Sequence, residues 1–329
     1  MKWLLLPFQA GKPWNGETIY HDSLGGSESA VAYLARDLVR AGENVTVLTH
    51  GKAGVFDDVT YVGNDQLENL GRIQWDVVVS SRWPQILDME WKTKTRMLWL
   101  HDLPSQNLMA RTNRIVFISE YQRSQYYMGN GSDVAKIIGD GVGEEFLDAT
   151  AERSDNRLIW TSNPDRGLPI AAHIFQSVRK CWPELEFHIY GRFSTYGWDD
   201  DSERVYLPRP CDREGVFLHS SLPRKALALE VAKSWAFFYP TCWPETFCMA
   251  ALEAQACGTP VIASPFGALN ETVKGGVLTY DFLNAVSQLR NKRRWEKLSV
   301  LGLEQAQQFT WAKVAQQWIK EAHDACNIS

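Results

Sequence analysis

Short apolar runs alternate with amphipathic stretches along the whole chain. The first run, at residues 3–8, predicts a compact strand, and a polar loop containing glycine follows it. Residues 27–40 then predict a helix, because four apolar side chains recur on one face at the helical repeat: Val31, Leu34, Ala35 and Leu38. The chain therefore begins with a strand, a loop and a helix.

Further apolar runs predict the strands of a parallel sheet. Each is short and uninterrupted, which is typical of strands that helices cover on both faces. In the first part of the chain these runs lie at residues 44–49, 76–80, 96–100, 114–118 and 134–138.

A glycine-rich segment at residues 139–143 and the charged residues 148–156 break this alternation. We place a domain boundary there, because a second alternating series follows. Its predicted strands are residues 157–161, 185–190, 205–207, 236–239 and 260–263, and its predicted helices are residues 169–181, 224–233 and 245–257. The chain is mainly helical from residue 281 and ends in an amphipathic helix at residues 310–325. We therefore predict domains at residues 1–147 and 148–308 and a C-terminal segment at residues 309–329.

Composition fits two globular α/β domains. The 329 residues exceed what one core usually organises, and contents of 45% hydrophobic and 22% charged residues are ordinary. A net charge of −5 gives no overall basic field that would attract nucleic acid. Ligands of such sheets bind at the carboxyl ends of the strands, so two facing domains would share a cleft as their natural site.

Cysteine usage and hydropathy predict a cytoplasmic protein. The six cysteines form no C-x-x-C pair and no zinc-like spacing, which indicates reduced thiols. Residues 1–8 predict a first strand and not a signal peptide. No apolar run approaches the roughly 18 residues that a membrane-spanning helix needs. This does not exclude attachment of the protein to a membrane surface.

Gly25-Gly26-Ser27, directly before the first helix, is the first candidate site. Glycines let the backbone approach a ligand closely, and a helix N-terminus offers free N–H groups and a positive dipole end to a phosphate. The same residues also fit an ordinary turn in which Ser27 is the N-cap.

Two glutamates, Glu245 and Glu253, form the second candidate site. The two residues are eight positions apart on the helix predicted at residues 245–257, which is a little over two turns. Their carboxylates would therefore lie near one face of that helix. Glu245 would sit at the helix start, where its charge suits the dipole, and Phe247 and Cys248 would offer N–H groups of the first turn. Two solvent-facing glutamates on an amphipathic helix are the alternative.

This motif opens with Pro-Glu-Thr-Phe and closes with Gly-Thr-Pro. It resembles the signature of retaining GT-B glycosyltransferases, especially glycosyltransferase family 4 (glycosyl transferases group 1). The resemblance implies the GT-B fold, with two facing Rossmann-like, doubly wound parallel-sheet domains and an interdomain cleft. It also implies that Glu245 binds hydroxyls of the donor sugar and Glu253 holds the ribose of the nucleotide. N–H groups of Thr246, Phe247 and Cys248 would approach the sugar and the diphosphate.

The loop at residues 162–168 resembles a diphosphate-binding loop of the same family. Asn163 and Arg166 would contact the donor there, with Arg166 at the position of the family's lysine. Thr161 stands where the family usually has a second cation, an arginine, and Arg192 is the candidate to replace it. A guanidinium can hold phosphate through two parallel hydrogen bonds, so one cation at this loop is expected.

His101 follows the predicted strand at residues 96–100. The resemblance implies that His101 contacts the donor sugar, whereas a lone histidine is otherwise more often structural. The resemblance also implies that the final helix braces the first domain, which would hold the acceptor. Four residues of that domain lie in loops suited to an acceptor: Trp14, Asn15, Arg82 and Trp83.

Asp199-Asp200-Asp201 is the remaining candidate. Such a triplet can hold a divalent metal with a sugar nucleotide in the other major glycosyltransferase fold. No companion motif supports that role, so we expect a solvated acidic loop. The resemblance implies a site without metal or cofactor, in which cations and helix ends stabilise the leaving diphosphate.

Together these expectations describe a retaining glycosyltransferase that moves a sugar from a nucleotide-diphosphate sugar to an acceptor hydroxyl. A saccharide, a lipid-linked sugar or another hydroxyl compound could be the acceptor, and the donor sugar and base stay open. A sugar-nucleotide epimerase of the same fold and a non-catalytic nucleotide-sugar-binding protein are the alternatives.

Overall fold

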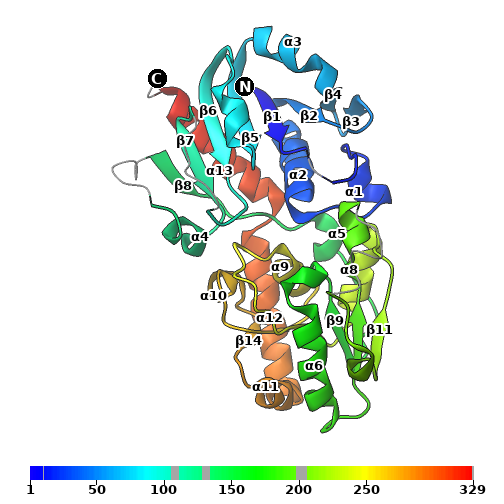
Figure 1. The fold of residues 1–329 in the computed structure, drawn as a ribbon. Helices are drawn as coiled ribbons and strands as arrows, with labels where there is room; N and C mark the ends of the chain where they lie inside the picture. The colour runs from blue at the N-terminus through cyan, green and yellow to red at the C-terminus, as the bar shows by residue number, and fades with distance from the viewer. Residues whose placement is uncertain (10, 105–110, 128–133, 198–205, 328–329) are drawn as a thin grey trace. The chain divides into compact units, whose positions relative to one another are not determined.

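The computed structural model describes residues 1–9, 11–104, 111–127, 134–197 and 206–327 (Figure 1). The chain divides into two units. Unit 1 comprises Met1–Gly141 and Trp311–Ser329, and unit 2 comprises Val142–Thr310. The acidic loop at residues 199–201 lies outside the described residues.

Unit 1 is built on an eight-stranded sheet in the order β3-β4-β2-β1-β5-β6-β7-β8. Its neighbouring strands are parallel except for β3 and β4, which form an antiparallel pair. The strands are β1 Lys2–Pro7, β2 Asn44–Thr49, β3 Gly54–Phe56, β4 Val59–Gly63, β5 Trp75–Ser81, β6 Thr93–Trp99, β7 Arg114–Phe117 and β8 Ala135–Ile137.

The helices of unit 1 are α1 Thr18–His21, α2 Gly26–Arg40, α3 Leu67–Arg72, α4 Glu120–Ser124 and α13 Trp311–Asn327, with the 3-10 helix η2 at Pro84–Asp88. Helix α13 packs against α2 and β6 (Figure 1). Trp311 stacks on Tyr33 of α2 with ring centres 5.8 Å apart, and Trp318 packs edge-on against Trp99 of β6 at 5.0 Å. The C-terminal helix therefore contributes large aromatic side chains to the core of unit 1.

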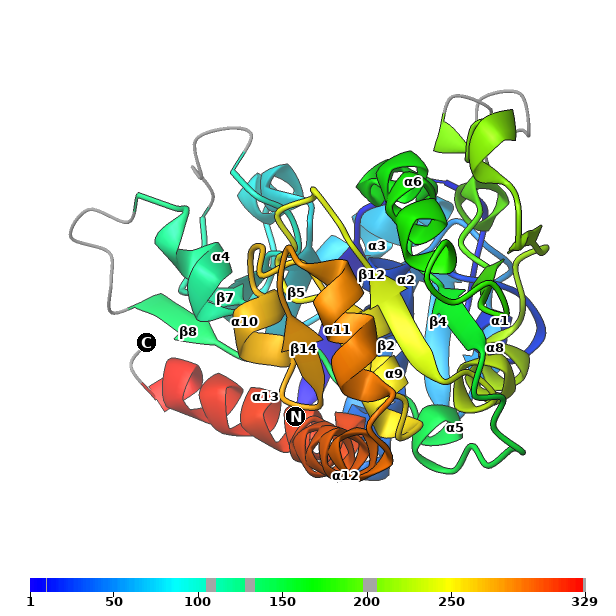
Figure 2. The same cartoon turned by 90° about the horizontal axis from the view of Figure 1, so that it is seen from below.

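Unit 2 is built on a six-stranded, fully parallel sheet in the order β11-β10-β9-β12-β13-β14. Its strands are β9 Arg157–Trp160, β10 Glu186–Ile189, β11 Val216–Leu218, β12 Ala236–Tyr239, β13 Val261–Ala263 and β14 Gly276–Leu278. Its helices are α5 Glu144–Leu147, α6 Leu168–Arg179, α8 Arg224–Ala232, α9 Met249–Ala256, α10 Leu269–Thr272, α11 Phe282–Leu289 and α12 Lys292–Gln308. Helix α12 packs along α9 (Figure 2).

The predicted α/β architecture with two predominantly parallel sheets is confirmed. The predicted strand at residues 205–207 is wrong, because Tyr206 and Leu207 are not in a strand and the edge strand is β11. Pro208 and Pro210 follow this apolar run and cannot donate ladder hydrogen bonds, and Tyr206 packs edge-on against Phe193 at 5.1 Å.

Candidate functional site

Each sheet has one point at which its strand order reverses. In unit 1 the strands β2 and β4 lie on one side of β1, and β5, which comes later in the chain, lies on its other side. The reversal point of unit 1 is therefore between β1 and β5. In unit 2 it passes from β9 to β10 and β11 and later adds β12 on the other side of β9. Ligands of doubly wound sheets bind outside the carboxyl ends of the strands at such a point. Arg166 follows β9 and Glu245 follows β12, so the sequence motifs meet at the reversal point of unit 2.

Glu245 is a buried carboxylate, with 6% of its surface exposed. The hydroxyl of Tyr239, the last residue of β12, donates a hydrogen bond to it, and Nη1 of Arg166 lies 3.3 Å from both carboxylate oxygens. Burial raises the pKa of Tyr239 well above its ordinary value, so the phenol remains a donor at neutral pH. Two donors, Tyr239 at the end of β12 and Arg166 in the loop after β9, therefore hold the Glu245 carboxylate in place.

Arg166 is held on several sides. Its guanidinium carbon lies 4.5 Å from the ring centre of Trp243, its Nε lies 3.5 Å from Asp165, and its carbonyl accepts a hydrogen bond from Thr241 at 2.6 Å. Asn163 caps the 3-10 helix η4 (Pro164–Arg166), because its side chain accepts from the N–H of Asp165 at 3.3 Å. The structure thus brings together Arg166 and Glu245, which the sequence predicted separately, and sequence reasoning missed Tyr239 and Trp243.

The prediction that Glu245 and Glu253 share one face of a single helix is wrong. Helix α9 begins at Met249, and Glu245 and the next two residues lie in the loop before it. Cys248, the N-cap, has φ 71° and ψ 71°, in the left-handed region that an L-residue helix cannot continue through. The helix therefore starts four residues later than residue 245, where the spacing argument placed it.

Glu253 forms a buried ion pair with Arg224, the first residue of α8. Arg224 also lies 3.7 Å from Glu145, and its guanidinium carbon is 4.9 Å from the ring centre of Phe146. Burial raises the pKa of Glu253, and the charge of Arg224 opposes that shift. Sequence reasoning missed Arg224, although a basic residue at a helix N-terminus opposes the dipole and so indicates a local partner.

The glycine turn of unit 1 lies at the other reversal point. Gly25 is the N-cap of α2, and Ser27 in its first turn accepts a hydrogen bond from Nη1 of Arg82 at 3.0 Å. Arg82 has φ 61°, and its Nε donates to Asp102 at 2.7 Å. A shallow recess at these strand ends is lined by Pro7, Phe8, Ser27, Glu28, Ser81 and Arg82.

His101 lies two residues beyond the end of β6, and its side chain is 8% exposed. Its ring centre is 4.5 Å from that of Trp99, and its Nδ1 is 3.8 Å from Oδ2 of Asp140. Burial lowers the pKa of His101 to about 3, so the imidazole is neutral at physiological pH.

The residues predicted for the acceptor divide into two kinds. Trp14 and Asn15 are buried: Trp14 packs edge-on against Tyr61 at 6.4 Å, and the Asn15 amide donates to the carbonyl of Lys52 at 3.1 Å. Trp83 is half-buried and edge-on to Phe8 at 6.4 Å, and Arg82 is half-buried beside the recess. The acceptor role of all four stays a prediction.

Among the residues that the structure describes, no three His, Cys, Asp or Glu side chains cluster as metal ligands would. Within the same residues, every helix is too short or too polar to cross a bilayer. Arg192, the proposed second cation, follows β10 as the N-cap of the 3-10 helix η5 (Phe193–Tyr196).

Comparisons with known proteins agree with this arrangement. Residues 163–310 match the model of the family "Glycosyl transferases group 1". D-inositol 3-phosphate glycosyltransferase of Kribbella flavida is 34% identical over 163 residues, which cover 46% of this chain and 38% of that protein. Matches to the curated relatives span only 20% to 38% of the relatives' lengths.

Two solved structures share the fold along the whole chain. Sucrose-phosphate synthase from Thermosynechococcus elongatus matches with a TM-score of 0.72 and 16% identity, covering 100% of both chains. Anabaena HepE in complex with UDP-glucose matches with a TM-score of 0.74 and 16% identity, covering 98% of this chain and 100% of that one. The chain therefore has the fold of the GT-B glycosyltransferases, and its residues 163–310 are similar to the glycosyl transferases group 1.

Proposed function

We propose that this protein is a retaining glycosyltransferase that moves a sugar from a nucleotide-diphosphate sugar to an acceptor hydroxyl without a metal ion. One observation carries the proposal: Arg166 and Glu245, a cation and a buried carboxylate, meet 3.3 Å apart at the reversal point of the unit 2 sheet. A diphosphate needs the cation, and sugar hydroxyls need the carboxylate. The names of the relatives support a sugar nucleotide as donor, since HepE was solved with UDP-glucose and also with UDP and glucose.

Arg166 would stabilise the leaving group. As the bond between the anomeric carbon and the diphosphate breaks, negative charge grows on the phosphate oxygens. A guanidinium that tightens on those oxygens in the transition state supplies about 2–4 kcal/mol, as other preorganised donors do. Trp243 keeps this guanidinium against its ring face while the hydrogen-bond partners change.

Glu245 would orient the sugar. Without a donor its carboxylate accepts from Tyr239 and Arg166. When Arg166 turns to the diphosphate, lone pairs of Glu245 become available to the sugar hydroxyls, and Tyr239 keeps the carboxylate in place. The acceptor oxygen then bonds to the anomeric carbon on the face that the diphosphate leaves, and a donor phosphate oxygen takes the acceptor proton.

Donor binding is tested first, with a thermal-shift panel of UDP-, GDP-, ADP- and TDP-linked sugars. The right donor should raise the unfolding temperature by mass action, with stabilisation of about 2.7 kcal/mol at a hundredfold excess over Kd. Affinity for none of these donors in calorimetry would contradict the proposal. A chelator should leave transfer unchanged, and loss of transfer that Mg²⁺ or Mn²⁺ restores would overturn the metal-free part.

The carboxylate is tested with Glu245→Gln. We expect kcat/KM to fall about 10²–10³-fold with an unchanged unfolding temperature, since the loss is of transition-state contacts. Glu304→Gln, at an exposed position on α12, is the matched control and should be silent. Near-normal turnover by Glu245→Gln would remove Glu245 from the site. Anomeric analysis of the product tests retention, and an isomerised donor sugar in a reaction without acceptor would indicate an epimerase instead.

A further inference from the structure

Thr241 is a buried residue in the loop after β12, with 4% of its surface exposed. Its hydroxyl donates a hydrogen bond to the carbonyl of Arg166 at 2.6 Å and accepts one from the backbone N–H of Trp243 at 3.0 Å. We propose that Thr241 is a positioning residue, whose hydroxyl joins the two loops of the unit 2 site and so sets the place of the Arg166 guanidinium for the donor diphosphate. This inference rests on the proposed function, in which Arg166 stabilises the leaving diphosphate.

One hydroxyl can serve both loops because it carries one O–H donor and two acceptor lone pairs. In Thr241 the donor is directed to the loop after β9, and a lone pair is directed to the loop after β12. Both distances are those of ordinary hydrogen bonds. Loss of the hydroxyl would therefore remove two hydrogen bonds from a place that water barely reaches, where such a loss is costly.

The backbones of the two loops also touch at this point. Gly167 has φ 103°, and a Cβ there would lie 3.1 Å from Sγ of Cys242 and 3.3 Å from the backbone nitrogen of the same cysteine. The N–H of Thr241 donates to the carbonyl of Tyr239 at 2.8 Å, which ties Thr241 to the last residue of β12. Thr241 is therefore fixed on its own strand, and its hydroxyl reaches across to the neighbouring loop.

Both ends of Arg166 are held with reference to this one oxygen. The carbonyl of Arg166 accepts from the hydroxyl directly, and the guanidinium carbon lies 4.5 Å from the ring centre of Trp243, whose N–H donates to the same hydroxyl. The hydroxyl thus limits the displacement of the guanidinium when Arg166 turns from Glu245 to the diphosphate. A cation held in this way loses less conformational entropy on binding and needs little reorganisation as negative charge develops.

A purely structural role for Thr241 makes a different prediction, and Thr259 provides the comparison. Thr259 is fully buried, and its hydroxyl donates to the carbonyl of Val231 at 2.9 Å and accepts from Arg153 at 2.8 Å. It lies just before β13, at the amino end of the parallel sheet and opposite the strand ends that carry the site. Thr259→Val therefore removes the same two kinds of hydrogen bond away from the site and is the matched control.

Calorimetry with UDP, GDP, ADP and TDP on the full chain tests the proposal. Thr241→Val keeps the shape of the side chain without the hydroxyl, and Thr241→Ser keeps the hydroxyl. For the nucleotide that the wild type binds, we expect Thr241→Val to lose affinity about tenfold and Thr241→Ser to stay within about threefold. Thr259→Val should lower the unfolding temperature and leave this affinity unchanged. Equal affinities of Thr241→Val and Thr241→Ser would overturn the proposal.

A double-mutant cycle shows whether Thr241 acts through Arg166. In the Arg166→Ala background we expect Thr241→Val to change nucleotide affinity by less than about twofold, because the cation that it positions is gone. A tenfold loss in both backgrounds would contradict the proposal, since a structural role predicts it. A wild type that binds none of the four nucleotides would contradict the proposed function and this inference together, whereas wild-type affinity that Thr241→Val retains would contradict this inference alone.

Hydrogen exchange of the wild-type chain gives a readout that needs neither a ligand nor a variant. The amide N–H of Trp243 lies in a loop and donates to Thr241, so we expect its exchange to be at least about tenfold slower than that of an unstructured peptide. In Thr241→Val the same amide should exchange faster, and in Thr241→Ser it should stay protected. An unprotected Trp243 amide in the wild type would overturn the proposal even if Thr241→Val fails to fold.

Discussion

Backbone strain marks the two reversal points. Among the described residues, the non-glycine residues with positive φ are Asp57, Asp58, Arg82 and Cys248. The two aspartates form the tight turn between β3 and β4, where short polar residues tolerate this conformation. Arg82 and Cys248 instead lie beside the candidate ligand contacts of each unit, where the surrounding structure holds them in an unfavourable conformation.

Cys248 gives a test of that strain. We expect Cys248→Gly to be more stable than Cys248→Ala by about 1 kcal/mol, because glycine adopts φ 71° without the Cβ clash. Both variants lose the buried thiol, so Cys248→Ala is the control for side-chain loss. Urea unfolding measures the difference. In an ordinary helix interior the alanine variant is the more stable of the two. A Cys248→Ala variant that is more stable than Cys248→Gly would therefore contradict the claim that residue 248 is strained.

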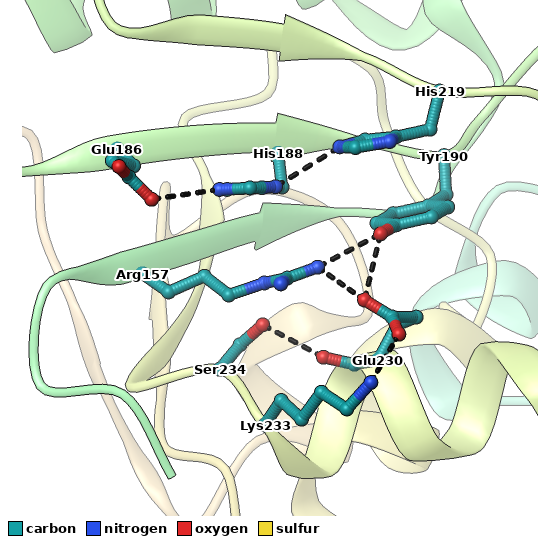
Figure 3. A network of polar contacts seen from close by, with 8 residues as sticks. All are labelled: Arg157, Glu186, His188, Tyr190, His219, Glu230, Lys233 and Ser234. Carbon is teal, nitrogen blue, oxygen red and sulfur yellow. Dashed lines mark hydrogen bonds and ion pairs between the residues drawn. The ribbon is translucent and has the colours of Figure 1, made fainter.

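At the scale of elements, a stack of rings joins strands β10 and β11 to their neighbours (Figure 3). The rings of His188 and His219 are parallel to within 9°, with Nδ1 of the first 2.9 Å from Nε2 of the second. Tyr190 stacks on His219 with ring centres 4.3 Å apart, and its hydroxyl donates to Glu230 of α8 at 2.7 Å. Arg157 of β9 donates to the same hydroxyl at 2.8 Å, so the network ties three strands to one helix.

This network predicts acid sensitivity. Burial lowers the pKa of both His188 and His219, and Arg157 lowers both further. The folded state therefore binds fewer protons than the unfolded chain, whose histidines titrate near 6.5. The stability is present above about pH 6.5 and is lost as pH falls through the lowered folded-state pKa values.

The check compares unfolding temperatures between pH 7 and pH 5. His219→Phe keeps a ring in the stack and removes one titrating group, so we expect a shallower fall than in the wild type. His21→Phe, at an exposed histidine of α1, should leave the slope unchanged. A slope that His219→Phe does not alter would contradict the prediction.

The elements also show what sequence patterns could predict. Runs such as residues 76–80 predict their strands because burial on both faces leaves an uninterrupted apolar segment. The three-residue strands β11 and β14 carry too little periodic signal, and β11 was misplaced at an equally short apolar run. The start of α9 was missed because the apolar pattern does not show a left-handed φ at a cysteine.

The candidate site also contains residues that the sequence could predict and residues that it could not. Arg166 and Glu245 belong to local motifs, and the sequence predicted both as site residues. Tyr239 has no motif of its own, since it matters through Glu245, which the fold brings close to its hydroxyl.

At the scale of the molecule, unit 1 is discontinuous in sequence. Helix α13 follows the whole of unit 2, yet Trp311 and Trp318 are buried in unit 1. Arg114 of β7 forms a buried ion pair with Glu321 of α13. Unit 2, residues 142–310, is continuous and carries its complete sheet.

Fragments test this difference. We expect residues 142–310 to unfold cooperatively on their own, and residues 1–141 to expose apolar surface and bind a hydrophobic dye. A peptide of residues 311–327 added in trans should reduce dye binding by 1–141, and the same peptide carrying Trp318→Ala should not. A cooperative transition in 1–141 alone, unaffected by the peptide, would show that α13 is dispensable.

The late position of α13 also sets an order of events during synthesis. A ribosome delivers all of residues 142–310 before Trp311 emerges, so residues 1–141 must wait for a segment that is made after unit 2. Through that interval the surface around Tyr33 and Trp99 is open to chaperones or to other nascent chains. A premature stop codon soon after Thr310 would therefore damage unit 1, which was made earlier, and spare unit 2, which has just been completed.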